Sequence, residues 1–497
     1  MIGEAIESRG LSGQGSNLIE GCSTGVGRQS FTEIFPPGHR FHGMLERADP
    51  DEVRRQLARA STGECVDICT IWGTPGFVGA LDKNLARQRE VYRPDRKVTL
   101  DATGGRTETL GNLRFHHVGL MLADPQQKNA VILLNDQKLK IEADLGIVKW
   151  YQDSGFADRV VFVSNVAELK RHCELNGVKV YACDDYGEEF SGHQVNSMQE
   201  FNLVNSKLSV EALAAEKNRP VQIRFCFQTA GIDVTKQGFE ELKGSHPQAF
   251  LKLCNIEQGG EGVIAVRDYN HFLTVCREQQ LAAERYGLNS IAYLQRAIPG
   301  VQQSFQLFFK PNDDVVRIVG LNTELVDPET HQNLGNKMVP VDADSITEDI
   351  GEMIISFADN LRKSCPNAHG FVMCDFRYDD NANAYKVIDP GMRVTASTCA
   401  GLVQLFAQRD AANGTCPYVT NYVPDLPKLP GVDFSTVRRE LGDLVNFGKV
   451  KSGGFGLIPS SWVAQHGTGR VIVVAPSEQD FSQVVSEIRA RMSRLVN

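Results

Sequence analysis

The stretch GFVMCDFRYDDNANAYKVIDPGMRVTAST, residues 370–398, carries the pattern that decides the fold. It starts with an apolar run that leads to Asp375, and an acidic turn rich in Asn follows. A second run then leads to Asp389 and, shortly after it, to Arg393. Two such runs joined by a short polar turn predict adjacent antiparallel strands. We therefore expect the two aspartates on neighbouring strands of one sheet.

A pair of carboxylates in this arrangement suits a hard cation. Mg²⁺ prefers oxygen ligands and completes its octahedron with nucleotide phosphates. Asp375 and Asp389 are therefore candidate metal ligands, and Arg393 is a candidate for contacting a transferring phosphoryl group or a substrate carboxylate. Structural explanations stay open, because single aspartates commonly make Asx contacts in turns and an arginine can serve as an ion-pair partner.

A lysine lies inside an apolar run in FLKLCNIEQGGEGVIAVRDYNHF, residues 250–272. Burying the Lys252 ammonium group is costly unless an anion pairs with it. The loop that follows contains Gly259, Gly260 and Gly262, and glycines let backbone amides approach phosphate oxygens closely. The pattern predicts a hairpin, then a helix, and a polyphosphate site that is neither a P-loop nor a Rossmann turn. A simple hairpin turn is the alternative.

Two weaker signals flank this hairpin. Upstream, Ser206 is a candidate N-cap and Lys207 a first-turn residue of a helix over SKLSVEALAAE, although a lone lysine there is more typical of a solvated helix face. Downstream, the strand in IAYLQRAIPG, residues 291–300, is expected to break before Pro299-Gly300. A strand that ends in this way can offer backbone groups to an adenine edge. The residues in that position are Gln295, Arg296 and Ile298.

The order of these segments resembles the ATP-grasp superfamily, whose members are mostly carboxylate–amine ligases. The resemblance covers residues 201–400 and implies ATP and Mg²⁺ as cofactors. By position, Lys207 and Lys252 match the nucleotide-phosphate lysines, and the glycines match the flexible loop over the phosphates. The resemblance assigns the other roles as follows: Gln295, Arg296 and Ile298 to the adenine hinge, Gln303 to the ribose, Asp375 and Asp389 to the metal, and Arg393 with Lys252 to catalysis.

One motif departs from the family pattern. The family usually shows Glu-x-Asn-Pro-Arg on its last strand, whereas this chain reads Asp389-Pro390-Gly391-Met392-Arg393. Whether the two are aligned through the proline or the arginine, one customary metal ligand is missing. Either a second metal is not held, or another residue supplies the ligand, with Glu324 and Asn336 as the candidates.

The expected fold class is α/β (α+β), with a layered α/β domain before a two-subdomain ATP-grasp fold built on antiparallel sheets. Helix-like segments alternate with short apolar runs over residues 46–200, which favours a layered unit. Residues 1–45 are expected to form a flexible extension that contributes nothing to the core. The expected parts are 1–45, the pre-ATP-grasp domain 46–200, the glycine-loop subdomain 201–300, the catalytic subdomain 301–400, and a C-terminal region 401–497 that packs on the catalytic subdomain.

Composition excludes several other classes of protein. The 497 residues include 52 Lys and Arg against 61 Asp and Glu, a net charge of −9 that argues against a nucleic-acid partner. No run approaches the ~20 apolar residues of a membrane span, and the first residues lack the apolar core of a secretory signal, so we expect a cytoplasmic protein. The 12 cysteines are scattered, which is typical of buried small side chains rather than of disulfides or zinc.

The function expected from these observations is an ATP-dependent, ADP-forming ligase. It would join a small carboxylic acid to an amine, as an amino-acid or peptide ligase in biosynthesis, through an acyl phosphate. The long N-terminal unit and the tail make the chain similar to peptide ligases of the pheganomycin type. Three alternatives stay open: an ATP-grasp kinase, a nucleotide-binding pseudoenzyme with a regulatory or scaffold role, and a binding module in which residues 46–200 are the working part. A homodimer is a possible assembly, and the substrates stay unnamed.

Overall fold

The computed structural model describes fourteen stretches of the chain. They are residues 31–59, 66–69, 118–123, 129–133, 141–163, 166–181, 192–253, 263–286, 290–326, 333–409, 419–423, 426–445, 456–463 and 468–496. Their strands form three sheets. Within these stretches, no helix has both the length and the apolar character that crossing a membrane requires.

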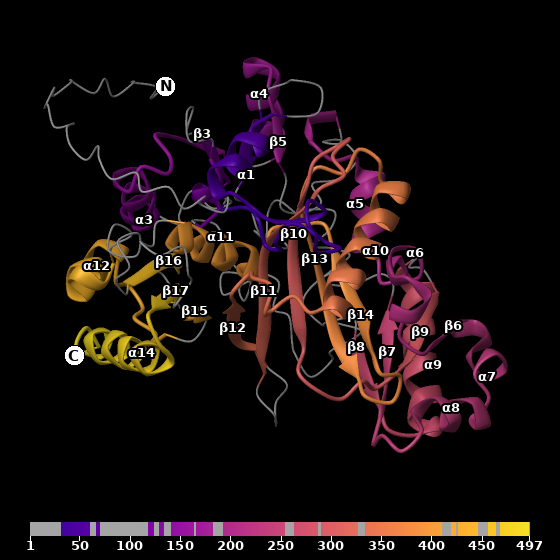
Figure 1. Ribbon diagram of the computed structural model, residues 1–497. Helices are drawn as coiled ribbons and strands as arrows, with labels where there is room; N and C mark the ends of the chain where they lie inside the picture. The colour runs from indigo at the N-terminus through magenta and orange to yellow at the C-terminus, as the bar shows by residue number, and fades with distance from the viewer. Residues whose placement is uncertain are drawn as a thin grey trace, which may run out of the picture. The chain divides into compact units, whose positions relative to one another are not determined.

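The large sheet contains nine of the described strands and runs in the order β14-β13-β10-β11-β12-β15-β17-β16 (Figure 1). Neighbours along this path are antiparallel, while β1 pairs with β11 in parallel. The strands are β1 (Leu45–Arg47), β10 (Gln303–Phe309), β11 (Val316–Val326), β12 (Asn333–Val339), β13 (Gly370–Asp379), β14 (Ala384–Gly391), β15 (Val419–Val423), β16 (Gly456–Val463) and β17 (Thr468–Ala475).

Helix α10 (Glu348–Ser364) shares an apolar core with one face of the large sheet. Thr347 caps the helix by accepting a hydrogen bond from the Ile350 amide at 3.4 Å, and two acidic residues in the first turn complement the helix dipole. Phe357 of the helix contacts Phe305 of β10 edge to face, with ring centroids 5.4 Å apart. Each such buried side chain contributes ~1.5–3 kcal/mol to stability, so this face is fixed by packing and the opposite face is free to carry polar groups.

The small sheet has the antiparallel order β6-β9-β7-β8. Its strands are β6 (Gln222–Cys226), β7 (Ala249–Leu253), β8 (Val263–Val266) and β9 (Ile291–Arg296). The helices of this part are α7 (Ala230–Asp233), α8 (Lys236–Lys243) and α9 (Tyr269–Tyr286). The expected hairpin and following helix are confirmed as β7, β8 and α9, while Gly259, Gly260 and Gly262 lie outside the described residues.

The parallel sheet has four strands, all from the region of residues 46–200 in which helix-like segments alternate with short apolar runs. Its order is β4-β3-β2-β5, from β2 (Val66–Cys69), β3 (Asn129–Leu133), β4 (Arg159–Val163) and β5 (Lys179–Tyr181). The helices here are α1 (Pro50–Leu57), a 3-10 helix (Val118–Leu122), α3 (Ile141–Asp153) and α4 (Val166–Asn176). Gly177 follows α4 with φ +61°, a conformation that glycine adopts without strain. The expected α/β class is confirmed.

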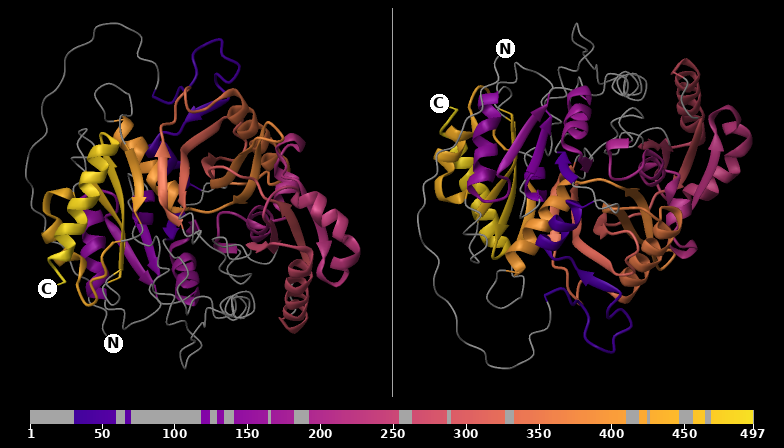
Figure 2. Two further views of the ribbon diagram at one scale, coloured as in Figure 1. Left: turned by 90° about the horizontal axis from the view of Figure 1, so that it is seen from below. Right: turned by 90° about the horizontal axis from the view of Figure 1, so that it is seen from above.

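The remaining helices pack on strands of the large sheet or on a helix beside its C-terminal strands. They are α5 (Met198–Asn205), α6 (Ser209–Leu213), α11 (Ala396–Arg409), α12 (Phe434–Leu441) and α14 (Glu478–Ser493). Figure 2 shows α14 in yellow alongside the yellow C-terminal strands, and its Ile488 belongs to the same core cluster as Ile472 of β17. Strands from the last hundred residues therefore continue the large sheet rather than only packing on it.

Two local expectations differ from the structure. The segment around residues 31–47 is not a free extension, because Phe35, Phe41 and Leu45 are buried in the core cluster that includes α10 and β1 pairs with β11. The helix expected to start at Ser206 starts instead at Ser209, so Lys207 lies in the turn between α5 and α6. In both places, tertiary contacts across the chain outweigh the local sequence pattern.

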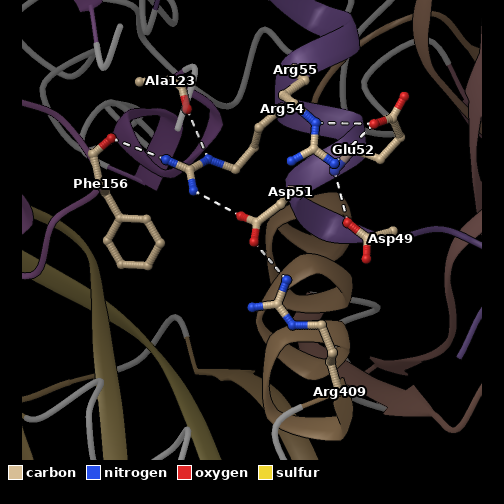
Figure 3. A network of polar contacts seen from close by, with 8 residues as sticks. All are labelled: Asp49, Asp51, Glu52, Arg54, Arg55, Ala123, Phe156 and Arg409. Carbon is tan, nitrogen blue, oxygen red and sulfur yellow. Dashed lines mark hydrogen bonds and ion pairs between the residues drawn. The ribbon is translucent and has the colours of Figure 1, made fainter. Parts of the chain in front are cut away.

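Arg54 of α1 connects three parts of the fold (Figure 3). Its guanidinium donates to the carbonyl oxygens of Ala123, at 2.8 Å, and Phe156, at 3.2 Å, and pairs with Asp51 at 3.2 Å. Asp51 in turn pairs with Arg409 at the end of α11, at 2.6 Å. These contacts fix α1 against the α/β unit on one side and against α11 on the other.

We predict that His369, just before β13, makes stability pH-dependent. The side chain is buried, its Nε2 lies 3.0 Å from the Gln56 carbonyl, and its Nδ1 has no hydrogen-bond partner among the described residues. Burial lowers the pKa of His369 to about 4. Between pH 4 and 6.5 the unfolded chain therefore binds a proton that the folded chain does not, and the free energy of unfolding falls as the pH drops through this window, by up to about 3 kcal/mol.

Urea unfolding at pH 7 and at pH 4.5 tests this prediction. His369→Gln keeps a donor for the Gln56 carbonyl but does not titrate, so its loss of stability on acidification should be smaller than that of the wild type by up to about 3 kcal/mol. Equal losses in the two proteins would contradict the prediction.

Candidate functional site

Asp375 of β13 and Asp389 of β14 are directly paired across the two strands. Asp375 also pairs with Ser304 of β10, which in turn pairs with Asn322 of β11. Directly paired residues in a sheet share a face, so one polar row crosses four strands. The Ser304 hydroxyl donates to Asn322 Oδ1 at 2.6 Å, which agrees with this placement. The prediction of two carboxylates on adjacent antiparallel strands is confirmed.

Lys207 reaches this row from the turn between α5 and α6. Its side chain is 2% exposed and forms an ion pair with Asp389, whose side chain is 18% exposed. The solvated helix lysine considered from the sequence is therefore ruled out. Because a buried ammonium group needs an anionic partner, the Lys207–Asp389 pair fixes the turn against β14.

Lys252 of β7 approaches the same point from the small sheet. Its Nζ donates to the carbonyl of Ile388 at 2.9 Å. The β13–β14 register shifts between Asp375 and Phe376, which leaves Ile388 unpaired as a bulge residue. A bulge turns a backbone carbonyl out of the ladder, and here Lys252 takes it. Burial lowers the pKa of Lys252 to about 8, although Asp389 and Asp375 act in the opposite direction.

Asp375, Glu324 and Asp389 differ in how far nearby positive charges offset their burial. Burial raises the pKa of Asp375, and the neighbouring Glu324 and Asp389 carboxylates raise it further. Burial also raises the pKa of Glu324, against the opposing effect of Arg377. For Asp389, burial is outweighed by Lys207, Lys252 and Arg393, which together lower its pKa. The Asp389 charge is therefore compensated by the protein, while Asp375 and Glu324 lack comparable compensation.

Arg393 lies just beyond β14 and is oriented by Asn205, the last residue of α5. Asn205 Oδ1 accepts from the Met392 amide at 3.1 Å and from Arg393 Nη1 at 3.3 Å, and Asn205 Nδ2 donates to the Phe201 carbonyl at 2.8 Å. Arg393 also contributes to the lowered pKa of Asp389. The structure thus brings Arg393, Lys207, Lys252 and both aspartates together, as expected.

The expected adenine-hinge residues lie at the end of β9 and just after it, and β9 ends at Arg296, before Pro299-Gly300 as expected. Gln295 is buried, and its Oε1 has no hydrogen-bond partner in the described part of the chain. Arg296 is engaged with Asp379 at 2.6 Å, and the Ile298 carbonyl accepts from Arg377. Gln303 pairs with Phe376, on the opposite face from Asp375, so the structure does not bring it to the carboxylates.

Two polar residues of this region were not identified from the sequence. Arg377 donates to the Ile298 carbonyl at 3.1 Å and to Gln302 Oε1 at 2.8 Å. Gln302 Nε2 donates to Asp375 Oδ2 at 3.1 Å. The period of two along a strand places residue 377 on the same face as Asp375, so strand alternation could have identified Arg377 from the sequence. Gln302 is the neighbour of Gln303, the residue that the resemblance assigned to the ribose.

The carboxylates fit a magnesium ion that takes some of its ligands from the protein and the others from phosphate. Among the described residues, no group of three or more His, Cys, Asp and Glu side chains is arranged to hold a metal by itself. Mg²⁺ is commonly bound through one or two carboxylates together with substrate phosphates. Asp375 Oδ1 is buried and has no hydrogen-bond partner among the described residues, so this oxygen is available as a ligand for a cation. Glu324 and Asn336, the candidates for a further ligand, are paired with each other across β11 and β12.

We predict that Asp375→Asn stabilises the protein. The raised pKa of Asp375 means that the folded chain holds this proton more tightly than the unfolded chain, so ionisation of Asp375 destabilises the fold increasingly above the ordinary carboxyl range. Removing the charge should raise the free energy of unfolding at pH 8 and have little effect at pH 3. Asp380→Asn, in the exposed turn after β13, is the matched control. A destabilised Asp375→Asn variant at pH 8 would contradict the assignment.

No family model matches the sequence, and no curated protein matches it. Solved structures do resemble it in fold. N5-carboxyaminoimidazole ribonucleotide synthetase, in an ADP complex, has 14% identity and a TM-score of 0.47, over 78% of this chain and 96% of that one. L-amino acid ligase from Bacillus licheniformis has 10% identity and a TM-score of 0.44, over 75% and 94%. Biotin carboxylase from Campylobacter jejuni has 12% identity and a TM-score of 0.49, over 87% and 95%. The likeness concerns the fold alone.

Proposed function

We propose that this chain is an ATP-dependent ligase of the ATP-grasp type, which joins a carboxylic acid to an amine and releases ADP and phosphate. The observation that carries the proposal is the convergence of Lys207, Lys252 and Arg393 on Asp389, beside Asp375, one of whose carboxylate oxygens has no hydrogen-bond partner among the described residues. These residues come from separate parts of the chain. Their shared location is difficult to explain by packing, because buried charges cost more than apolar side chains of similar volume.

The cationic residues are suited to binding a polyphosphate. Lys207 and Lys252 each approach the Asp389 strand, one from the α5–α6 turn and one from the small sheet. An arriving triphosphate offers both ammonium groups anionic oxygens in place of the Asp389 carboxylate and the Ile388 carbonyl. Gln295 and Ile298, at the end of β9, are proposed for the purine, because the buried Gln295 Oε1 is an acceptor without a partner among the described residues.

The proposed reaction needs positioning and charge neutralisation rather than a protein nucleophile. The γ-phosphoryl group passes from ATP to a substrate carboxylate, which leaves ADP and an acyl phosphate. An amine then attacks the acyl carbon, and phosphate leaves as the amide forms and the amine nitrogen loses a proton. Arg393, held by Asn205, would orient the carboxylate or the transferring group. Asp375 and Asp389 would hold Mg²⁺, which when bound supplies neutralisation of the phosphate charge. Exclusion of water protects an acyl phosphate, and the 254–262 segment with its glycines is proposed to serve that purpose.

We also propose that the three sheets correspond to functional parts. The parallel sheet would belong to the pre-ATP-grasp domain, the small sheet to the glycine-loop subdomain, and the large sheet to the catalytic subdomain. We further propose that the carboxylic acid is an amino acid or a peptide, as in the peptide ligases of the pheganomycin type that the chain resembles.

A second candidate is a nucleotide-binding protein that performs no ligation and acts as a regulator. The observation that favours it is the identity of the residues opposite Asp375 and Phe376, namely Asp389 and Val387, where the family pattern would place a further carboxylate or amide ligand. Binding of ATP without any acid-dependent ADP release distinguishes this candidate from an enzyme.

Formation of ADP and of a hydroxamate tests the proposed function. Wild-type protein with ATP, Mg²⁺ and a panel of amino acids and dipeptides should release ADP, and added hydroxylamine should trap the acyl phosphate as a hydroxamate detectable by mass spectrometry. Lys252→Met removes one phosphate-binding cation from a buried strand position, so we expect the rate of ADP release to fall by at least ~100-fold while the far-ultraviolet circular dichroism stays unchanged.

The exposed Lys236, at the start of α8, supplies the control, and Lys236→Met should retain the wild-type rate. A phosphorylated product without hydroxamate would identify a kinase instead. Full turnover by Lys252→Met would refute the assignment of that lysine.

A further inference from the structure

Residues 297–302 connect β9 of the small sheet directly to β10 of the large sheet. Lys252 and the proposed purine edge belong to the small sheet, while both aspartates belong to the large one. Any change in the position of β9 relative to β13 must therefore bend this linker. Gly300, inside the linker, has φ +98°, a conformation that favours glycine.

Arg377 attaches the linker to β13 at two points. One terminal nitrogen donates to the Ile298 carbonyl at 3.1 Å, and the other donates to Gln302 Oε1 at 2.8 Å. A guanidinium group is planar and holds its donors in a fixed fork. The distance between Ile298 and Gln302 is therefore set by a rigid group on the strand that also carries Asp375.

Gln302 links Arg377 to the Asp375 carboxylate through its side-chain amide. Arginine donates only, so the oxygen of the Gln302 amide must face Arg377. The Gln302 amide nitrogen then faces the other way, and it donates to Asp375 Oδ2 at 3.1 Å. The result is a continuous chain of hydrogen bonds from the Ile298 carbonyl through Arg377 and Gln302 to Asp375.

The linker is also anchored at its start by a contact that does not involve Asp375. Arg296 pairs with Asp379 at 2.6 Å, and the Asp379 side chain is 2% exposed. This anchor keeps β9 attached to β13 when the chain of hydrogen bonds is broken. Variants of Gln302 or Arg377 are therefore expected to fold.

We infer that Arg377 and Gln302 are positioning residues that couple the carboxylate end of the nucleotide site to its purine end. The inference rests on the proposed function. A cation at Asp375 fixes the carboxylate, Gln302 follows Asp375, and Arg377 carries the position to the carbonyl of Ile298, which follows Gln295 closely in the chain. Coupling between two sites is reciprocal, so metal and purine binding strengthen each other through this chain of hydrogen bonds.

Calorimetric titration of ADP, in excess Mg²⁺ and separately in EDTA, tests the coupling. Wild type should bind ADP more tightly in Mg²⁺. Gln302→Met, which has similar length but neither hydrogen bond, should lose at least ~10-fold in affinity in Mg²⁺ and less than ~2-fold in EDTA. Arg377→Met should behave in the same way, and Arg377→Lys, which can keep one of the two contacts, should recover part of the loss. The exposed Arg267, changed to Met, is the control.

A double variant separates coupling from a purely structural role. Asp375→Asn removes the carboxylate, so adding Gln302→Met to it should cost little further affinity in Mg²⁺. Equal losses in Mg²⁺ and EDTA, or additive losses in the double variant, would overturn the inference and leave the proposed function intact. A wild-type protein that binds no ADP would overturn the proposed function, and this inference with it.

Discussion

Unequal charge compensation of two facing carboxylates governs this structure. Asp389 is surrounded by Lys207, Lys252 and Arg393, and its pKa is lowered in spite of burial. Asp375, directly opposite, has a neutral amide at one oxygen and no partner among the described residues at the other, and its pKa is raised. A fold selected for stability alone gains little from such an arrangement. A ligand that brings both a cation and an anion gains from it, because the cation satisfies Asp375 and the anion takes over the lysines.

The fold supports these charges through the two faces of the large sheet. One face is buried by α10 around Phe305 and Phe357, which fixes the strand register. That register then determines which side chains appear on the polar face, since a shift by one residue would exchange the faces. The bulge at Ile388 is the one departure from regular pairing between β13 and β14, and it supplies the carbonyl that Lys252 binds.

Local pattern in the sequence was sufficient for some parts of this site and not for others. The Asp375–Asp389 pair and the Lys252 hairpin follow from strand alternation and turn residues close in sequence, and both are confirmed. Lys207 and Asp389 are separated by 182 positions, so the burial of Lys207 has no local signal. Gln302 and Gln303 are adjacent residues of the same type, and the sequence does not show which of them reaches Asp375, because that depends on where the pairing of β10 with β13 begins. The burial of Phe35 and Phe41 could not be predicted from their local sequence. The surrounding Pro and Gly residues are typical of a loop, and the residues that bury the two rings lie on distant strands and helices.

Crystals grown with Mn²⁺ in place of Mg²⁺ and a non-hydrolysable ATP analogue test the central claim most directly. Mn²⁺ takes similar oxygen ligands and can be located by its anomalous scattering. The account predicts an anomalous peak within coordination distance of Asp375 and Asp389, with Lys207 and Lys252 contacting phosphate oxygens. An analogue bound elsewhere, or bound with its phosphates away from both lysines and no peak at the aspartates, would contradict it.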